Sequence, residues 1–445
     1  MKLKYFSIPV LALALHSCSG ESGEPTPAPA EGQKIAILVM AGNDNEGTRA
    51  GRQLTSSETA SDIDEVSMAI YSLNDDNSIG SRVFSRTLNW KDSIAGLTDG
   101  QMVHVNLKNV PELSGSAGLP DGRYAIVATG YSSTRTYSLT PGADGLNSVS
   151  PVMKALFPGE AAGEEIFAGS IPEVVVSGSR FTTGGSDGGF KTIVLSRQTA
   201  GTFGYFKNIP ATGFDGTEAT HLRLVASGKN NLLILGAFDS NSDIVNGSRS
   251  GDIHPDGEFA GGAGGYVVYE TALRDWFPRG DVNNDGVLND KDANFNGMSG
   301  NWKVPSWLDG KIMLKQGTVF CSNFVVPFLS NGTSTFELQL TAKAGNGSTT
   351  ILRRWAVNCG DLQENIQLLD EKGLTSATET TETAASYSIL RNHLYTIGKK
   401  SMAFPDPDDP SVKEDPEDLN KGEIVVVSVN DKWTEHHSLV IKPQI

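Results

Sequence analysis

Short runs in which hydrophobic and polar residues alternate constrain the fold of this chain more than any other feature. Alternation at every second residue places apolar side chains on one face of a strand, so these runs predict strands that are buried on one side. Turn-forming clusters, such as 74–77, 120–122 and 345–347, separate the runs. The clearest runs are 35–40, 66–73, 102–107, 124–128, 193–196, 222–225, 232–235, 265–269, 336–340, 424–429 and 438–441. This pattern is typical of antiparallel sandwiches.

Few windows have helical periodicity, and the best short helix candidates are 150–156 and 361–369. Predicted strands do not alternate with predicted helices, as they would in a Rossmann or barrel enzyme. The predicted fold is therefore mainly all-β, with two antiparallel β-sandwich domains of Greek-key type and a few short helices. The chain is long enough for two domains. We expect the boundary within 209–216, which gives an N-terminal domain over 50–210 and a C-terminal domain over 211–445.

The first residues of the chain are typical of an exported protein. A short positive segment precedes an apolar run over 8–15, which is about half of the ~20 residues that a spanning helix needs. The tetrad that ends at Cys18 is similar to the lipobox of bacterial lipoproteins, in which the cysteine carries a diacylglyceryl group. We therefore expect a signal peptide over 1–17, lipidation at Cys18 and a flexible tether over 19–32. The alternative is an ordinary secretory signal with an incidental cysteine.

A strongly apolar strand over 34–41 is followed at once by a polar, glycine-rich stretch over 42–52. This stretch offers Arg49 and Arg52 to an arginine-specific protease, because exposed loop tips are preferred cleavage sites. Cleavage at Arg49 would separate the strand from the rest of the chain. The sandwich would then have an apolar groove with an unpaired edge, which is a receptor for a foreign strand. The alternative is a first strand, a loop and two solvated arginines.

The net charge of −16 limits the partners of the chain. It argues against nucleic acid and against an anionic membrane surface. No second apolar stretch of ~18 residues occurs, so we expect nothing beyond the leader to span a bilayer. The acidic, proline-rich stretch 405–418 is expected to be a solvated loop. Apolar strands follow it, and a terminal strand on a loose connection can pair away from its own body.

Two cysteines remain after Cys18. Cys321 and Cys359 lie in strand-like segments, and export permits a disulfide between them. Sequence does not fix their geometry, so two buried thiols are the alternative.

The segment 281–292 has the residue spacing of a calcium-binding loop. Oxygen-bearing side chains stand at positions one, three, five, nine and twelve, and Gly286 stands at the sharp turn. With the backbone carbonyl of Val287 included, the expected ligands are Asp281, Asn283, Asp285, Val287, Asn289 and Asp292. The segment resembles a single dockerin repeat, whereas dockerins carry two, so we do not expect cohesin binding. We expect a structural Ca²⁺ ion that orders the loop; the alternative is an Asp/Asn-rich turn that binds nothing.

The sequence contains no catalytic constellation. The adjacent His436 and His437 would point to opposite faces of a strand, so a shared metal is not expected. The glycine-rich stretch 261–265 precedes a strand rather than a helix, which is not a phosphate-binding context. The usual motifs of zinc proteases, serine hydrolases and P-loop proteins are missing. We therefore expect that the protein is not an enzyme.

Four stretches of the sequence resemble the fimbrillin superfamily, the type V pilus subunits of Bacteroidales-like bacteria. The first is the lipobox at Cys18 with its short tether, and the second is the apolar strand before Thr48-Arg49-Ala50. The third, 122–130, looks like the N-domain strand of the family. The fourth and most specific, 389–397, looks like its C-domain Arg-Asn-x-x-Tyr signature.

The resemblance implies a structural and adhesive subunit of a surface fimbria. A precursor at the cell outer membrane would lose its lipidated tether and first strand, residues 18–49, to an arginine-specific protease. Carried over from the family, Arg49 is the cleavage residue and Ala50 the mature N-terminus. The C-terminal strand of another subunit would then fill the vacated groove in the extracellular fimbrium.

The signature residues Arg391, Asn392 and Tyr395 are structural in this family. We expect them to order the C-domain sheet. Asn392 would bond local backbone, and Tyr395 would anchor the core through its ring and hydroxyl.

The acidic stretch and the calcium-like loop suggest an accessory or tip subunit of the minor fimbriae rather than a stalk subunit. Arg49 argues against an anchor subunit, because anchors keep their first strand. The expected partners are other fimbrial subunits, an arginine-specific protease and a host or bacterial surface ligand. The outer membrane would be contacted only through the lipid of the precursor. The alternative function is a monomeric surface lipoprotein that binds a glycan or host protein and retains its lipid anchor.

Overall fold

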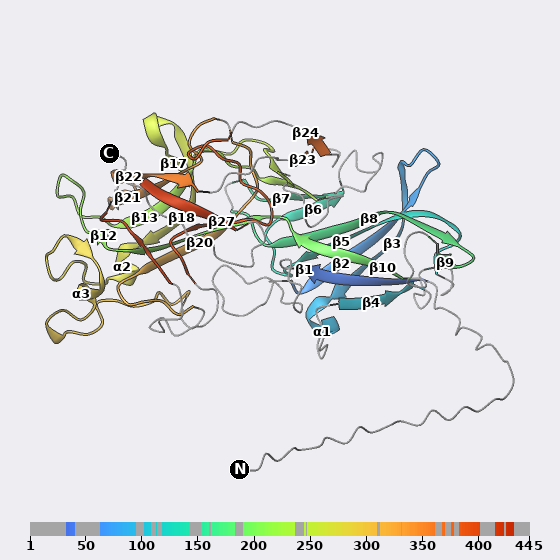
Figure 1. Cartoon of the computed structure of the whole chain (residues 1–445), viewed down its shortest axis with the longest axis horizontal. Helices are drawn as coiled ribbons and strands as arrows, with labels where there is room; N and C mark the ends of the chain where they lie inside the picture. The colour runs from blue at the N-terminus through green and yellow to red at the C-terminus, as the bar shows by residue number, and fades with distance from the viewer. Residues whose placement is uncertain are drawn as a thin grey trace, which may run out of the picture.

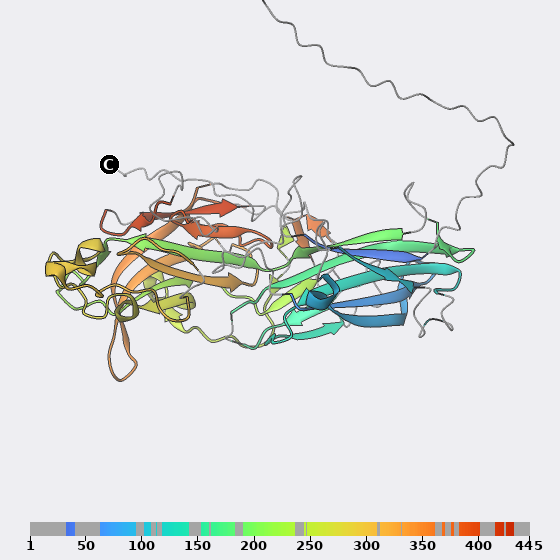
Figure 2. The same ribbon diagram turned by 90° about the horizontal axis from the view of Figure 1, so that it is seen from below.

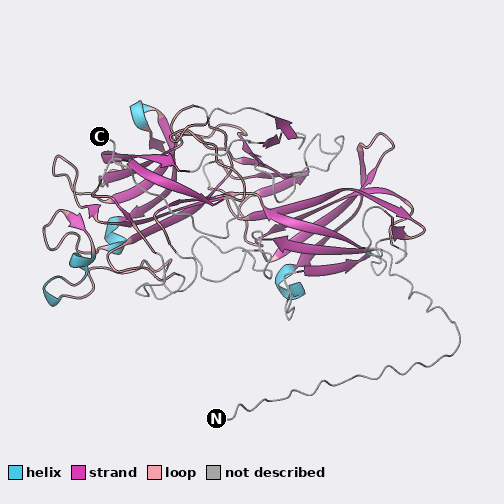
Figure 3. Cartoon of the chain, in the orientation of Figure 1, coloured by secondary structure: helices cyan, strands magenta, loops and turns pink. Residues whose placement is uncertain are grey.

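The computed structural model of the chain consists mainly of strands, arranged in two halves along the long axis of the molecule (Figures 1 and 3). The all-β class predicted from the sequence is confirmed. The structure describes residues 33–40, 63–94, 102–107, 113, 118–141, 153–159, 162–182, 190–235, 244–245, 247–308, 312–330, 332–360, 367–369, 375–377, 382–400, 414–421 and 424–430.

The N-terminal half contains an eight-stranded sheet in the order β3-β2-β5-β8-β10-β1-β4, with β9 beside β8. The strands are β1 Lys34–Met40, β2 Glu65–Leu73, β3 Ile79–Asn89, β4 Met102–Asn106, β5 Gly122–Tyr131, β8 Ile166–Ser177, β9 Arg180–Phe181 and β10 Phe190–Arg197. One helix, α1 (Trp90–Ile94), follows β3. Alternation is clear in β2, where Val66, Met68 and Ile70 are fully buried in the core of this half.

The C-terminal half contains a ten-stranded sheet in the order β17-β18-β13-β21-β22-β27-β25-β11-β20, with β26 beside β11. The strands are β11 Ala200–Lys207, β13 His221–Ala226, β17 Gly257–Glu258, β18 Gly264–Ala272, β20 Val319–Val325, β21 Phe336–Lys343, β22 Thr349–Cys359, β25 Leu394–Ile397, β26 Glu417–Asp418 and β27 Ile424–Asn430. The short helices are α2 Leu273–Trp276 and α3 Asp290–Ala293, with 3-10 turns at Ala260–Gly262 and Phe295–Gly297. Aromatic side chains, among them Phe203, Phe320 and Trp276, fill the core.

A four-stranded sheet at the centre of the molecule joins the two halves (Figure 2). It contains β6 Ser138–Pro141, β7 Met153–Leu156, β14 Leu232–Leu235 and β16 Gly247–Ser248, in the order β16-β14-β7-β6. Its small core takes Phe157 from one half and Leu233 from the other. Two smaller sheets complete the fold: β12 (Ile209–Pro210) with β19 (Val287–Leu288), and β15 (Ile244–Val245) with β23 (Gln367–Leu369) and β24 (Thr375–Ala377).

The chain passes from the first large sheet to the second earlier than the sequence predicts. β10 ends at Arg197 and β11 begins at Ala200, where it pairs with β20 and β25 of the C-terminal sheet. The passage is fixed by a buried ion pair, in which Arg197 Nε donates to Glu165 Oε1 at 2.9 Å. The expected boundary stretch instead forms β12 and a turn that pack on the segment 281–292.

Both helix candidates from the sequence are wrong, because the described parts of them are strands. Residues 153–156 form β7 and residues 367–369 form β23. In both cases pairing with a distant strand overrides a weak local preference. Within the described ranges, every helix is too short or too polar to cross a bilayer.

Most of the predicted strands are present, but the pairing is not purely antiparallel. β1 pairs with β10, β11 with β25, and β22 with β27 in parallel. Parallel pairs need a long connection, and each of these pairs joins segments that are far apart in the sequence. Pattern reading missed β11, because every residue from Ala200 to Phe206 is buried and no alternation remains.

The structure holds Cys321 and Cys359 as buried cysteines with no disulfide between them. They lie on β20 and β22, which are not neighbours in the sheet. A disulfide requires Cα atoms within about 7 Å of each other. Burial raises the pKa of the Cys321 thiol.

Glu417 lies where β26 pairs with β11, opposite Phe206. Burial raises the pKa of Glu417 to about 7 from its ordinary 4.5, and the Asp415 carboxylate acts in the same direction. The folded protein therefore holds this proton more tightly than the unfolded chain does. The resulting stability is fully present below pH 4.5 and is lost as the pH rises through about 7.

We predict that Glu417→Gln removes this loss. At pH 8 the variant should be more stable than the wild type by about 1–2 kcal/mol more than at pH 4. The gain is smaller than the full pKa shift would give, because the side chain of Glu417 is partly exposed to water. Urea unfolding of both proteins at the two pH values measures the difference. Asp252→Asn, which alters an exposed carboxylate, serves as the control. An equal gap at both pH values would contradict the assignment.

Candidate functional site

The first strand occupies an interior position in the N-terminal sheet. β1 pairs in parallel with β10 along its whole length, from Lys34 opposite Phe190 to Met40 opposite Ser196. On its other side it pairs antiparallel with β4, from Lys34 opposite Asn106 to Leu38 opposite Met102. Both edges of β1 are therefore used in backbone hydrogen bonding.

Three side chains fasten β1 to the core. Ile35 and Ile37 are fully buried among the apolar residues of the N-terminal half. Gln33, just before the strand, is also fully buried. Its Oε1 accepts from Leu119 N at 2.7 Å and its Nε2 donates to Leu119 O at 2.9 Å. Sequence reading missed Gln33, whose only sign was a polar residue at the start of an apolar run.

Two strands depend on β1 for their place in the sheet. β4 is the last strand in the order, and β1 is its neighbour. Within the described part of the chain, β10 pairs with β8 at two positions, Ser196 opposite Ala168 and Arg197 opposite Phe167. If β1 left, β4 and most of β10 would have unpaired backbone edges beside an apolar core, which is the condition for accepting another strand.

Several residues singled out in the sequence lie outside the described residues. They are the lipidation residue Cys18, the cleavage residues Arg49 and Ala50, the predicted strand 438–441 and most of the acidic stretch 405–418. The last strand among the described residues is β27, which lies between β22 and β25 in the C-terminal sheet.

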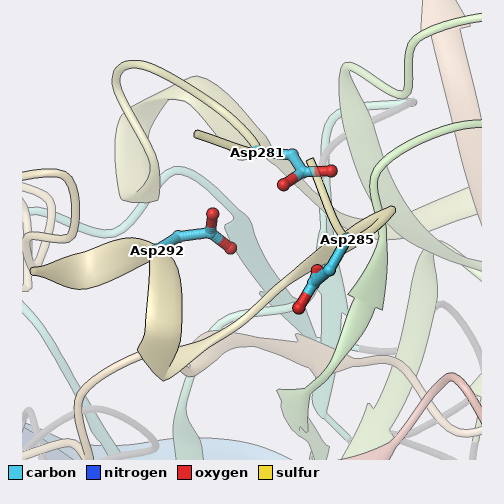
Figure 4. A group of neighbouring side chains, drawn as sticks. All are labelled: Asp281, Asp285 and Asp292. Atoms are coloured by element: carbon cyan, nitrogen blue, oxygen red, sulfur yellow. The ribbon is translucent and has the colours of Figure 1, made fainter. Parts of the chain in front are cut away.

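The calcium-like loop brings three of its predicted ligands together. Asp281, Asp285 and Asp292 each point a carboxylate towards a common centre (Figure 4). The ligand oxygens, one from each residue, lie within 4.8 Å of one another. Three carboxylates at this spacing repel one another unless a cation or protons neutralise them.

The backbone of the loop is held in place by its own side chains. Asp292 is fully buried, and Oδ1 accepts from Val282 N at 2.9 Å while Oδ2 accepts from Asn289 N at 3.1 Å. Asn289 caps α3 by accepting from Lys291 N at 2.8 Å. Gly286 has φ 82°, a conformation that glycine adopts without strain, and its N–H donates to Asp281 Oδ2 at 2.8 Å.

The donor set of this loop fits a hard cation. Asp281 Oδ1 is buried and accepts no hydrogen bond from the described part of the chain. Burial raises the pKa of Asp292, and the charge of Asp281 adds to the rise, while three backbone hydrogen bonds oppose it. Oxygen ligands, two of them buried, around a tight glycine turn are what Ca²⁺ prefers in proteins.

The Arg-Asn-x-x-Tyr segment forms a closed loop before β25. The Tyr395 hydroxyl donates to Ser388 O at 3.0 Å and accepts from Leu390 N at 2.9 Å. Its ring stacks on Tyr387, with centroids 6.3 Å apart. Tyr395 thus anchors the core through its ring and its hydroxyl, which is the role that the family resemblance implied.

Asn392 acts differently from the expectation. Its Oδ1 is buried and accepts no hydrogen bond from the described residues, so the expected side-chain bond to local backbone through this oxygen is absent. The residue instead has φ 54°, a left-handed conformation that asparagine tolerates better than most residues. This turn lets its N–H donate to Thr199 O at 3.0 Å, beside the start of β11.

No family profile matches the chain, and no curated protein matches it. Solved structures do match. The fimbrial anchor protein Mfa2 from Porphyromonas gingivalis is 11% identical over 90% of this chain and 98% of that chain, with a TM-score of 0.32. The tip fimbrial protein Mfa3 from the same organism, with a C-terminal truncation, is 9% identical over 82% and 94%, with a TM-score of 0.30.

A fimbrial assembly protein from Parabacteroides distasonis is 12% identical over 83% of this chain and 92% of that chain, with a TM-score of 0.31. Other solved structures that match are described as putative adhesins from Bacteroides ovatus and Bacteroides thetaiotaomicron.

We predict that Tyr395→Phe destabilises the C-terminal half by about 1–3 kcal/mol, because a buried N–H and a buried carbonyl lose their partner while the ring stays. Urea unfolding measures the loss. Tyr387→Phe is the matched control, since that hydroxyl makes one long bond of 3.4 Å to Val357 O. Equal losses in the two variants would show that the Tyr395 hydroxyl does not hold the loop.

Proposed function

We propose that the chain is a structural and adhesive subunit of a bacterial surface fimbria, exported as a lipoprotein and assembled by strand exchange, in an accessory or tip position. One observation carries the proposal: β1 is the shared neighbour of β10 and β4, and it directly precedes the segment that contains Arg49. A cut there leaves β1 attached only through noncovalent contacts.

Departure of β1 would create a groove of defined chemistry. The groove has backbone edges on both sides, contributed by β10 and β4, and an apolar floor that Ile35 and Ile37 now cover. Fully burying a side chain of this size contributes about 1.5–3 kcal/mol. The empty groove is therefore unstable in water, and a strand with alternate apolar residues lowers its free energy.

The expected donor is the terminal run 438–441 of another subunit, which carries apolar residues after the last described strand. A donor strand that enters the groove forms ladders with β10 and β4 at once. Such an exchange replaces the contacts of β1 without any new chemistry. The lipidated tether leaves with β1, so the subunit is freed from the outer membrane in the same step.

We predict that an arginine-specific protease cuts the purified precursor to give a new N-terminus at Ala50. The cut subunit should form higher oligomers when it is mixed with a partner chain that carries its C-terminal strand, because the groove takes up that strand. N-terminal sequencing and size-exclusion chromatography measure the two steps.

Two variants separate cleavage from assembly. Arg49→Gln should block the start at Ala50, whereas Arg52→Gln should leave it unchanged. A precursor that resists cleavage at Arg49, or a cut subunit that keeps β1 and stays monomeric, would favour the second function. That function is a monomeric surface lipoprotein that retains its lipid anchor and binds a glycan or host protein.

We also propose that the loop 281–292 holds a structural Ca²⁺ ion. The buried, unbonded Asp281 Oδ1 favours this, together with the three converging carboxylates. Asn283, Asn289 and the Val287 carbonyl would complete the ligand set. The ion would fasten the loop to β12, because β19 within the loop pairs with Ile209 and Pro210.

We predict that calcium at about 10 mM stabilises the wild type by about 1–3 kcal/mol relative to excess chelator, as expected for extracellular sites of 10⁻⁴–10⁻³ M affinity. Asp281→Asn should abolish the effect. Asp290→Asn, an exposed neighbour outside the cluster, should retain it. Thermal melting measures both. No shift for the wild type would leave an Asp/Asn-rich turn that binds nothing.

A further inference from the structure

The space that β1 and its flanking residue occupy has one polar subsite. Gln33, directly before the strand, places its side chain against the backbone of Leu119, and both residues are almost fully buried. Gln33 Oε1 accepts from Leu119 N at 2.7 Å, and Gln33 Nε2 donates to Leu119 O at 2.9 Å. One side chain thus satisfies both the donor and the acceptor of one residue. The carboxamide takes the place that a peptide group of a neighbouring strand would occupy.

Gly118 makes room for this side chain. Its φ is 84°, a conformation that glycine adopts without strain. A Cβ atom at Gly118 would lie 2.5 Å from Gln33 Oε1 and 3.0 Å from Gln33 Cδ, so any other residue here would displace the carboxamide. We call Gly118, Leu119 and the space that the Gln33 side chain fills the amide subsite.

The amide subsite is the selective part of the groove. The backbone carbonyl of Gln33 accepts from Leu107 N at 3.0 Å, and every residue offers such a carbonyl. Ile35 and Ile37 follow at alternate positions and are buried in the core, where other apolar side chains of similar volume can replace them. Among these three side chains only Gln33 makes directional contacts. The groove therefore distinguishes one strand from another at this subsite.

A primary carboxamide fits the amide subsite better than any other kind of side chain. An ionised carboxylate has two acceptors and no donor, so one of its oxygens would face the Leu119 carbonyl oxygen. An aliphatic side chain of the same length would bury the N–H and C=O of Leu119 without partners, and buried unpaired groups are costly. Glutamine reaches Leu119 at full length, whereas asparagine is one methylene shorter.

We propose that the amide subsite selects the strand that replaces β1. The preferred donor carries glutamine two residues before the first of two alternating apolar residues, in the pattern Gln-x-apolar-x-apolar read in the direction of β1. This inference rests on the strand exchange proposed above and adds the chemistry by which the partner is recognised.

The terminal run of this chain does not have that pattern. If Leu439 and Ile441 took the places of the two isoleucines, His437 would reach the amide subsite, and in the opposite direction Pro443 would. The two nitrogens of an imidazole point away from each other, so they do not meet an N–H and a C=O side by side, and proline has no polar side-chain atom. The run fills the apolar positions only. A different subunit is therefore a better donor than a second copy of this chain.

The test uses the full chain with a sequence-specific protease site introduced within 42–48, so that cutting does not depend on Arg49. The probes are fluorescent peptides of the sequence 32–41, either unchanged or with Gln33→Asn, Gln33→Met or Gln33→Glu, and a peptide of the run 435–445. Fluorescence polarisation follows the exchange of each peptide into the cut protein. The unchanged peptide should bind about tenfold to hundredfold more tightly than the Met, Glu and 435–445 peptides, with the Asn peptide between them.

Two glycine variants localise the selection. Gly118→Ala should remove the preference for glutamine, because the new Cβ occupies the amide subsite. Gly178→Ala is the matched control: Gly178 also has a positive φ, of 58°, but a Cβ there would meet no atom within 4 Å. That variant should keep the preference. Circular dichroism melting checks that both variants are folded, and the peptide series on the unaltered subsite decides the question if Gly118→Ala does not fold.

The outcomes separate this inference from strand exchange itself. Equal affinity of the unchanged and Gln33→Met peptides would overturn the amide selection while exchange stands. Binding of the 435–445 peptide as tight as that of the unchanged peptide would overturn the preference for a different subunit. Failure of every peptide to enter the groove, the unchanged one included, would overturn strand exchange and the amide selection with it.

Discussion

The backbone ladders on the two edges of β1 are the interaction on which the N-terminal sheet depends. Buried N–H and C=O groups need partners, and β1 supplies them to β10 on one side and β4 on the other. Most interior strands of a sheet are joined to a neighbour by a short connection. β1 is joined to neither neighbour in that way, because β4 and β10 follow it only after long stretches of chain. β1 is therefore an interior strand of the sheet, although it is far from both of its neighbours in the sequence.

That combination suits the strand exchange proposed above, in which another strand replaces β1. Its contacts are backbone hydrogen bonds and two isoleucines in a shared core, which any strand with suitable alternation can reproduce. Gln33 is the exception, since its paired bonds to Leu119 are specific to this side chain. A donor strand without an equivalent amide side chain would not form these two hydrogen bonds with the backbone N–H and C=O of Leu119.

The two halves of the molecule are bound together more closely than a linker between domains would bind them. β7 pairs with β14 across the junction, and Arg197 is paired with Glu165 where the chain crosses. Breaking a buried ion pair by removing one partner leaves an uncompensated charge. Loss of either partner would therefore destabilise the place where the chain passes from one large sheet to the other.

The sequence by itself determined the all-β class, most strand positions and the aspartate loop. Each of these depends on local spacing, either period-two alternation or oxygen-bearing side chains within one twelve-residue segment. Only the tertiary structure decided which strands pair, because pairing partners are chosen by packing over long sequence separations. It placed β1 between β10 and β4, kept Cys321 and Cys359 apart, and turned two helix candidates into strands.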